Sequence, residues 1–306
     1  MAQQPVQVQS PTEQVNPRTV HIDTVDTEQA LRMLHAEDAR VVPAIEPVLP
    51  ELARLVDESA ARVRAGGRVH YFGAGTSGRL AVLDAAELMP TFGWGDVVVA
   101  HHAGGPAALL TAVENAEDSE ADGARAAAEV GRGDVAIGLT ASGRTPYVGG
   151  ALRAARSAGA FTALMTANPQ PALADLADVL LAADTGPEAI TGSTRLKAGT
   201  AEKLMLNGFS TVLMVRLGRV HSNLMIGMRA TNAKLRGRSV RLLVQATGAS
   251  PEECAAALRA AGDIPTALLM LLSGADPERD VERSRQALAR AGGVVREALA
   301  LLRSES

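Results

Sequence analysis

Hydrophobic residues follow two different periods along the chain. From Thr27 to Arg64 they recur at helical spacing, and a Gly-Gly pair ends the second of two predicted helices. Between about residues 69 and 183 they form short runs instead, namely VHYF, DVVVAH, DVAIGLT, FTALMT and DVLLAA. Each run is followed by enough chain for a helix. Short apolar strands that alternate with helices indicate a doubly wound α/β fold with a parallel sheet buried on both faces.

The rest of the chain favours helices. Ser193 or Thr194 is predicted to cap a long helix that ends at about Leu217, a second helical stretch covers residues 223–248, and short helices interrupted by Gly and Pro follow. Residues 1–18 are rich in Gln, Pro, Ser and Thr and have little to bury. We therefore expect a disordered tail over 1–18, N-terminal helices packed on the core over 19–60, a sheet domain with its following long helices over 61–247, and a small helical domain over 248–306.

Composition narrows the classes of partner. The 306 residues are 47% hydrophobic, enough for a large core, while a formal charge of −4 and 2% aromatic residues argue against nucleic acid. The single cysteine, Cys254, cannot form an internal disulfide. No apolar run approaches a membrane span, and the N-terminus lacks the pattern of a signal peptide. We expect a cytoplasmic protein that binds neither membranes nor nucleic acid.

Two loops rich in small and hydroxyl residues follow predicted strands. They are GAGTSG, with Gly75, Thr76 and Ser77, and TASGRT, with Ser142, Gly143 and Thr145. Such a loop at the start of a helix directs backbone amides and hydroxyls at one spot, which suits a phosphate. The alternative is that both are tight turns with ordinary helix caps.

The glycines of the first loop also match the G-x-G-x-x-G spacing of dinucleotide sites. That reading requires an acidic residue at the end of the next strand, where this chain has His101 and His102 instead. Two hydroxyl-rich loops suit a compact phosphate monoester better. A third cluster, GSTRLKAGT, adds Ser193, Thr194 and Lys197, and Lys197 can supply the missing counter-charge unless it is an ordinary solvated lysine.

Four blocks carry a family resemblance. GAGTSGRLAVLDAAEL, AVENAEDS, ASGRTPYV and the long segment that begins GSTRLKAGTAEKLMLNGF resemble, in order and spacing, the N-acetylmuramic acid 6-phosphate etherases of the sugar isomerase (SIS) domain superfamily. The resemblance runs from about Ile22 to the C-terminus. Some positions depart from the family pattern: His101, His102, Met89 and the Asn-Gly-Phe at residues 207–209.

This resemblance implies a flavodoxin-like SIS domain, a small C-terminal helical domain and a homodimer. It also implies cleavage of the D-lactyl ether of N-acetylmuramic acid 6-phosphate, giving N-acetylglucosamine 6-phosphate and D-lactate. The general acid of the family corresponds to Glu87, and a second essential carboxylate corresponds to Glu117.

The chemistry of the reaction is compatible with two glutamates. Removal of the proton at carbon 2 of the open-chain sugar, next to the aldehyde, allows the lactyl oxygen at carbon 3 to leave, so one base and one acid are needed. We assign Glu117 as the base and Glu87 as the acid. No redox cofactor or metal is required, and we expect none.

The position of Glu87 raises a question of distance. Ten residues of helix from Ser77 to Glu87 span about 15 Å, more than a hexose phosphate bridges comfortably. Either that helix ends or bends early, or Glu87 serves a sugar held by the other subunit. We favour an active site at the dimer interface.

Two other functions compete with the lyase. A non-catalytic sensor of sugar phosphates, similar to the glucokinase regulatory protein, would keep the loops without an acid and a base. An aldose-ketose isomerase would remove the same proton but return it to carbon 1.

Overall fold

The chain divides into two compact units in the computed structural model, which describes residues 10–111, 113–228, 233–276 and 279–305. The first unit comprises Met1–Ala85 and Val97–Phe209, and the second comprises Ala86–Asp96 and Ser210–Ser306. Residues 210–247 therefore group with the C-terminal helices, whereas we expected that domain to begin at 248. The physical reason is that Leu243 is fully buried in the core of those helices.

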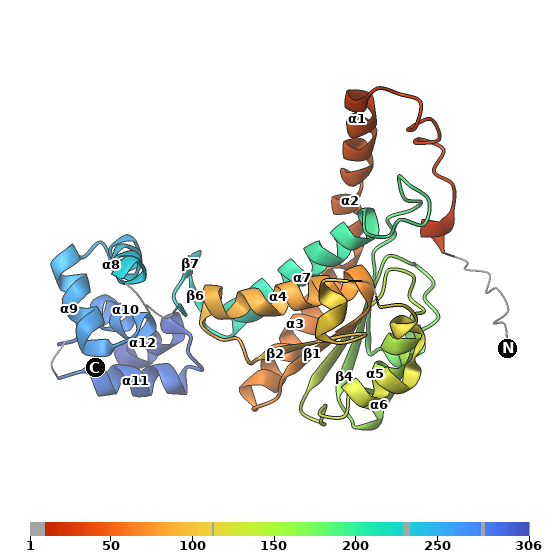
Figure 1. Cartoon of the computed structure of the whole chain (residues 1–306). Coiled ribbons are helices and arrows are strands. Elements are labelled where there is room, and N and C mark those ends of the chain that lie inside the picture. Colours follow the sequence, from red (N-terminus) through yellow and green to blue (C-terminus); the bar gives the residue numbers. More distant parts are fainter. Residues whose placement is uncertain (1–9, 112, 229–232, 277–278, 306) are drawn as a thin grey trace. The chain divides into compact units, whose positions relative to one another are not determined.

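The first unit is built on the parallel sheet that the sequence predicted. Its strands are β1 (Val69–Gly73), β2 (Val98–His102), β3 (Val135–Leu139), β4 (Phe161–Thr166) and β5 (Val179–Ala182). They pair in the order β2-β1-β3-β4-β5, with every pairing parallel (Figure 1). This is the strand order of the flavodoxin-like folds, so the predicted fold class is confirmed.

Helices cover both faces of this sheet. They are α3 (Leu49–Arg64), α4 (Gly75–Phe92), α5 (Glu120–Ala126), α6 (Pro146–Ser157) and α7 (Lys197–Arg216). Neighbouring side chains of β1 serve opposite faces, as the period of a strand requires. Tyr71 contacts Phe209 of α7 edge to face and donates to Asp84 of α4, while Phe72 joins the core beside α6.

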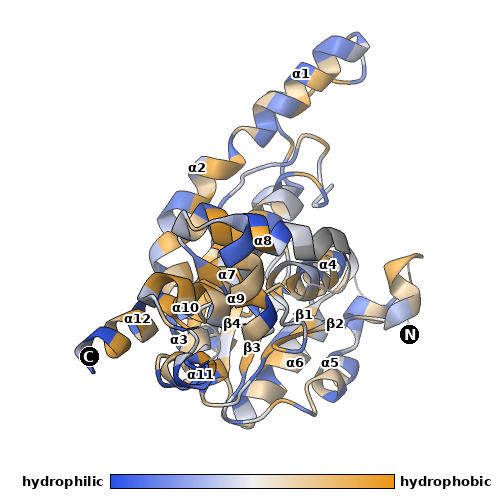
Figure 2. Cartoon of the chain, turned by 90° about the vertical axis from the view of Figure 1, so that its left-hand side faces the viewer, coloured by the Kyte–Doolittle hydropathy of each residue, from blue (hydrophilic) through white to orange (hydrophobic). Residues whose placement is uncertain are grey.

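The N-terminal part of the first unit projects from the sheet. Helix α1 (Thr27–Asp38) extends away from it and is followed by α2 (Val41–Ile45), as Figures 1 and 2 show. Leu31 is 60% exposed and Val42 is 67% exposed, so this projection presents hydrophobic side chains to solvent in the single chain.

Residues 10–18 differ from the disordered tail that we expected. Thr12 is fully buried and Asn16 is 2% exposed. The Thr12 carbonyl accepts from the Gly192 amide, and the Asn16 amide donates to Glu37. These polar contacts, rather than hydrophobic burial, attach the segment, and composition does not reveal them. Residues 1–9 lie outside the described residues.

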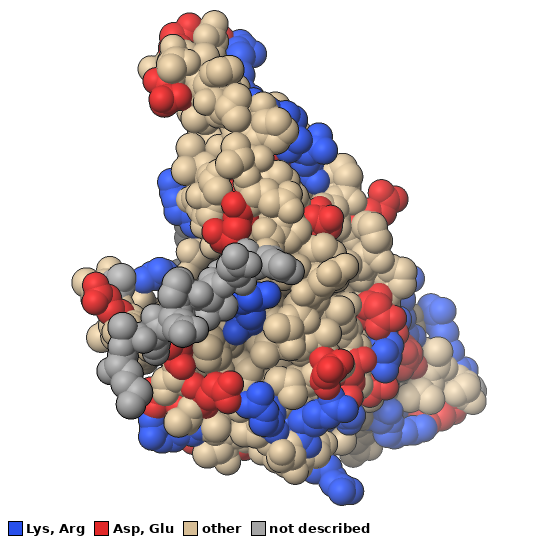
Figure 3. Space-filling model, turned by 90° about the vertical axis from the view of Figure 1, so that its right-hand side faces the viewer, with Lys and Arg blue, Asp and Glu red and all other residues tan. Residues whose placement is uncertain are grey.

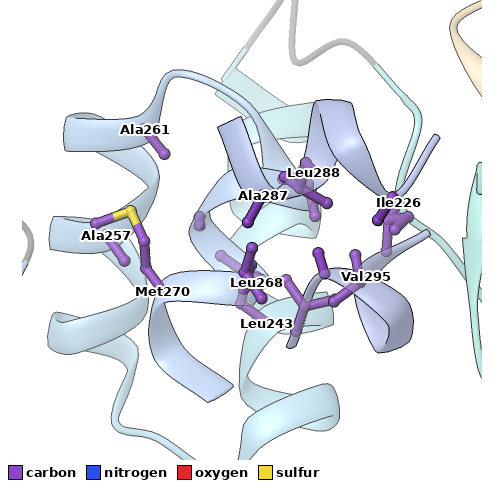
Figure 4. Packing of buried hydrophobic residues seen from close by; sticks show 14 of the residues in the cluster. Ile226, Leu243, Ala257, Ala261, Leu268, Met270, Ala287, Leu288 and Val295 are labelled. Atoms are coloured by element: carbon purple, nitrogen blue, oxygen red, sulfur yellow. The ribbon is translucent and has the colours of Figure 1, made fainter. Parts of the chain in front are cut away.

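The second unit is mainly helical. A hairpin of β6 (Val220–His221) and β7 (Leu224–Met225) precedes α8 (Ala233–Thr247), α9 (Pro251–Ala261), α10 (Ile264–Ser273), α11 (Val281–Arg290) and α12 (Val295–Ser304). The hairpin occupies the start of the segment that we predicted to be helical from residue 223. Leu243, Leu268 and Leu288 meet in the core (Figure 4), and α10 is the most hydrophobic of these helices (Figure 2). Cys254 is buried there, as a small core residue.

Short 3-10 helices complete the chain. They are η1 (Pro11–Glu13), η2 (Glu46–Val48), η3 (Pro106–Leu109), η4 (Ala116–Asp118) and η5 (Ala174–Leu176). Segments η3 and η4 follow β2 at the carboxyl edge of the sheet, where ligands bind in folds of this type.

Candidate functional site

The first two predicted loops lie side by side at the carboxyl edge of the sheet. One follows β1 and the other follows β3, which are neighbours in the sheet. Helix α4 begins at Gly75 and α6 at Pro146, so both loops open a helix as predicted. Gly75 has φ +54° and Gly143 has φ +72°, a conformation that other residues rarely adopt.

Close packing explains the glycine spacing of the first loop. A Cβ on Gly73 would lie 2.8 Å from the amide nitrogen of Gly78, and one on Gly78 would lie 2.5 Å from the His102 ring. The strand and the first turn of α4 can therefore approach only with glycine at both positions. This spacing serves the backbone itself and does not require a dinucleotide.

Hydroxyl groups of the second loop form a connected chain. The Oγ1 atoms of Thr140 and Thr145 are 2.7 Å apart, and Ser142 Oγ lies 3.3 Å from Thr140 Oγ1. The loop is supported from the end of β4, because Asn168 Nδ2 donates to the Ser142 carbonyl at 2.8 Å and Thr166 donates to the Ala141 carbonyl. These contacts hold the loop in one conformation.

Ser77 has a partner that sequence reasoning missed. Its Oγ lies 2.9 Å from Oε1 of Glu202 on α7, and both side chains are buried. Thr76 lies on the same helical turn, 3.4 Å from the position that a Cβ on Gly199 would take. Helix α7 therefore packs directly against the first turn of α4. Glu202 falls within the GTAEK sequence. Its position on the side of the helix that carries the buried residues was the one signal in the sequence for a buried carboxyl group.

A cavity of about 400 Å³ lies beside the first loop. Gly75, Arg79, His102 and Glu117 contribute to its walls, so two of the predicted site residues line one cavity. Arg79 Nε and Nη2 donate to the carbonyls of Leu109 and Ala108 at 3.0 and 2.9 Å. A guanidinium has five N–H donors, so these two bonds fix Arg79 while donors remain for another group.

The two adjacent histidines at the end of β2 have different surroundings. His102 faces the cavity, with its Nε2 3.2 Å from the Gly75 carbonyl. His101 stacks on Phe72 with ring centroids 4.6 Å apart, and its Nε2 is 3.0 Å from Nδ1 of His70. Burial lowers the pKa of His101 to about 4. Both histidines are half-buried, so they differ in their neighbours rather than in their exposure.

Lys197 is neither solvated nor directed at a cavity. Its side chain is 0% exposed and its Nζ donates to Glu37 at 2.6 Å. Glu37 also accepts from Arg18 and Asn16, and these hydrogen bonds, led by the one from Arg18, lower its pKa to about 2. The ammonium that we expected as a counter-charge for the ligand therefore already has a carboxylate partner in this chain.

The start of α7 differs from the predicted cap by Ser193 or Thr194. Glu188 is fully buried and its carboxylate accepts from the amides of Lys197 and Ala198 at 3.0 and 2.9 Å. A carboxylate at a helix N-terminus stabilises the helix through the free amides and the dipole. The cap comes from nine residues upstream, beyond the range of a local capping pattern. Ser193 and Thr194 lie half-buried in the turns that precede the helix.

The two predicted catalytic glutamates are both exposed in the single chain. Glu117 lies in η4 of the first unit and lines the cavity. Glu87 lies on α4, within the stretch that groups with the second unit. Helix α4 continues unbroken from Gly75 to Phe92.

A larger cavity, of about 950 Å³, belongs to the second unit. Its walls include Trp94 and Arg219, whose guanidinium lies 4.3 Å from the centre of the indole ring. It contains none of the predicted site residues. We base the candidate site on the smaller cavity, because that one lies at the carboxyl edge of the sheet.

Three further observations on the described residues bear on metal binding, membrane insertion and surface charge. No cluster of three or more His, Cys, Asp or Glu in residues 10–111, 113–228, 233–276 and 279–305 is arranged to hold a metal ion. No helix in that part of the chain has the length and hydrophobicity to cross a membrane. Acidic and basic side chains are interspersed on the face shown in Figure 3.

The chain is similar to proteins of several kinds. Residues 51–156 match the family described as glucokinase regulatory protein N-terminal SIS domain. An N-acetylmuramic acid 6-phosphate etherase from Thermobifida fusca is 60% identical over 268 residues, which cover 87% of this chain and 88% of the relative. One from Serratia proteamaculans is 49% identical over 275 residues, covering 89% of this chain and 93% of the relative.

Solved structures support the fold. A phosphoheptose isomerase from Francisella tularensis gives a TM-score of 0.51 at 16% identity and covers 63% of this chain and 100% of its own. A phosphoheptose isomerase from Neisseria gonorrhoeae gives 0.50 at 20% identity, with 61% and 98% covered. At these identities the likeness shows a shared fold and carries no statement about the reaction.

Proposed function

The chain belongs to the N-acetylmuramic acid 6-phosphate etherases, and from this premise we propose that its active site lies at the carboxyl edge of the sheet, beside the cavity lined by Gly75 and Glu117. The enzyme is a lyase that cleaves the D-lactyl ether of N-acetylmuramic acid 6-phosphate by elimination and hydration, giving N-acetylglucosamine 6-phosphate and D-lactate. The observation that carries the site is that Gly75 of the first loop and Glu117 line one cavity.

The phosphate, in this proposal, is held by the neutral donors of the loops. Thr76, Ser77 and the amide of Gly75 come from the start of α4. Ser142 and Thr145 come from the loop after β3, where Gly143 shapes the turn by donating its amide to the Thr140 carbonyl. Both groups lie at the ends of neighbouring strands, so one phosphate can contact both. Ser193 and Thr194 precede α7 and complete the set.

We assign the positive charge of the site to Arg79 rather than to Lys197. Arg79 lines the cavity and is held by two backbone carbonyls, whereas the Lys197 ammonium is buried on Glu37. The substrate carries two anionic groups, the phosphate and the lactyl carboxylate, and a fixed guanidinium suits either. Lys197 then acts indirectly, since it attaches the start of α7 to α1.

Glu117 is the base that removes the proton at carbon 2, and Glu87 protonates the lactyl oxygen as the bond at carbon 3 breaks. Water then adds to the unsaturated aldehyde with the two groups in reverse roles. A general acid must hold its proton near neutral pH, which burial favours. Both glutamates are exposed in the single chain, so a second surface is needed to cover them.

A partner subunit can supply that surface. Because α4 is continuous, Ser77 and Glu87 lie ten residues apart on one helix, about 15 Å. The continuity of α4 supports the arrangement in which Glu87 serves a sugar bound by the other subunit. The exposed Leu31 and Val42 on the N-terminal projection are consistent with an interface between copies of the chain.

Subunit complementation tests the shared site. Glu87→Gln and Glu117→Gln chains, each inactive in a coupled D-lactate assay, are mixed and allowed to exchange subunits. A shared site leaves one intact copy in each heterodimer, so about one quarter of the wild-type activity returns at equal amounts. If differently tagged chains exchange completely and the mixture stays inactive, the shared site is excluded.

The sensor and isomerase functions are distinguished from the lyase by their reaction products. A sensor releases no D-lactate, and an isomerase converts N-acetylglucosamine 6-phosphate into a ketose. Residues 51–156 match a domain of a regulatory protein, so the measurement of D-lactate release is needed to distinguish the lyase from a sensor.

A further inference from the structure

Glu202 is a buried carboxyl group that the proposed reaction does not use. Its side chain is 1% exposed, and Oε1 lies 2.9 Å from the hydroxyl oxygen of Ser77. Oε2 is buried and has no hydrogen-bond partner among the described residues. An ionised carboxylate in such a place would lack the donors that normally compensate for its lost hydration.

The surroundings of Glu202 favour its neutral form. Burial raises the pKa of Glu202 to about 8, the hydrogen bond with the Ser77 hydroxyl opposes this shift, and no charged group in the described part of the chain contributes. Four charged groups of α7 and α4 have other partners. Lys197 contacts Glu37, Lys203 contacts Asn207, Asp84 accepts from Tyr71, and Arg79 donates to two backbone carbonyls.

The protonation state decides which way the Ser77 hydroxyl points. A hydroxyl has one hydrogen to donate. When Glu202 is ionised, that hydrogen is held by the carboxylate and Ser77 cannot donate to a ligand. When Glu202 is a carboxylic acid, it can donate its own proton to Ser77 Oγ, and the serine hydrogen is then free to turn toward a phosphate oxygen.

We propose that Glu202 is a positioning residue that acts as a neutral carboxylic acid: it donates to Ser77 and so aims the Ser77 hydroxyl at the substrate phosphate. The inference rests on the proposed phosphate-binding role of Ser77. Ionised Glu202 opposes binding twice, because it takes the hydroxyl hydrogen and places a negative charge behind the phosphate site. The affinity for phosphorylated sugars therefore falls as pH rises past the titration of Glu202.

The test measures the dissociation constant of N-acetylglucosamine 6-phosphate by calorimetry between pH 7 and 9.5. The phosphate is already a dianion over most of this range. For the wild type we expect affinity to fall about tenfold per pH unit above the titration. Glu202→Gln keeps a neutral side chain with an N–H donor to Ser77, so its affinity should stay nearly constant. Glu28→Gln, which alters an exposed carboxylate on α1, should retain the wild-type profile.

Two outcomes overturn the inference. One is a wild-type affinity that does not change between pH 7 and 9.5, which requires no variant to fold. The other is Glu202→Gln with the wild-type pH dependence. Ser77→Ala separates this inference from the proposed function: unchanged affinity in that variant removes the phosphate role of Ser77 itself. Weakened affinity in Ser77→Ala, together with an unaltered profile in Glu202→Gln, removes only the role of Glu202.

Discussion

Replacing Glu37 by glutamine removes the carboxylate from a buried cluster that contains two cations. Glu37 is 2% exposed and accepts hydrogen bonds from Arg18, Lys197 and Asn16. The glutamine keeps the size of the side chain. It removes the carboxylate that forms an ion pair with the Lys197 ammonium, which is 0% exposed.

Two arguments give the expected loss of unfolding free energy in Glu37→Gln. The hydrogen bonds to Glu37, led by that from Arg18, lower its pKa from 4.5 to about 2. At about 1.36 kcal/mol per unit this corresponds to roughly 3 kcal/mol of stability. Breaking a buried ion pair by removing one partner costs about 3–5 kcal/mol. We therefore expect Glu37→Gln to lower the free energy of unfolding at pH 7 by about 3 kcal/mol or more.

The pH dependence has a definite sign. A folded-state pKa below the unfolded value stabilises the protein above about pH 4.5, and this contribution is lost as pH falls toward 2. The difference between wild type and Glu37→Gln should shrink over that interval. Urea unfolding followed by circular dichroism at several pH values measures it.

A matched control lies on the same helix. Glu28 pairs with Arg32 on α1, but these side chains are 74% and 76% exposed. Glu28→Gln should change stability by less than about 0.5 kcal/mol. If Glu37→Gln is no more destabilised than Glu28→Gln at pH 7, the reasoning about the buried cluster is refuted.

Three further predictions concern the site, the sheet and the helix packing. Arg79→Ala should weaken binding of the substrate. Parallel calorimetry with the product, which lacks the lactyl group, tells whether the lost contact was to the lactyl carboxylate or to the phosphate that both ligands carry. Unchanged binding of both ligands contradicts the assignment of Arg79. Because the pKa of His101 is lowered in the folded protein, stability is lost as pH falls from 6.5 toward 4. His101→Phe should make the free energy of unfolding less dependent on pH over this range. A pH dependence equal to that of the wild type contradicts the prediction. Gly123→Ala would bring a Cβ to 1.9 Å from the Tyr147 carbonyl and should lower the free energy of unfolding by about 1–3 kcal/mol or more. Gly133→Ala, with nothing within 4 Å of the added Cβ, should leave thermal unfolding nearly unchanged. Equal effects of the two substitutions contradict the packing argument.

The sequence predicted the features that depend on local pattern. Five apolar runs predicted five strands, because a strand buried on both faces must be apolar along its length. The loops that open α4 and α6 were also predicted, since glycine and hydroxyl residues between a strand and a helix are typical of a tight turn that begins a helix. Family membership followed from the four blocks and is confirmed by relatives at high identity.

Partners distant in the chain were beyond prediction. Lys197 is paired with Glu37, 160 residues away, and Ser77 with Glu202, 125 residues away. Each residue by itself resembles an ordinary charged or capping side chain. Only folding brings each pair together: hydrogen bonds then lower the pKa of Glu37, and burial raises the pKa of Glu202.

The chain by itself therefore determined the five strands and the two loops at the carboxyl edge of the sheet, because these are encoded by local pattern, and the order and spacing of four blocks determined the chemistry of the family. Tertiary structure alone decided which polar groups are buried, which carboxylates cap or neutralise them, and where the N-terminal segment attaches. The physical reason is that hydrogen bonds and ion pairs acquire their strength from the exclusion of water, which depends on neighbours that the linear sequence does not place side by side.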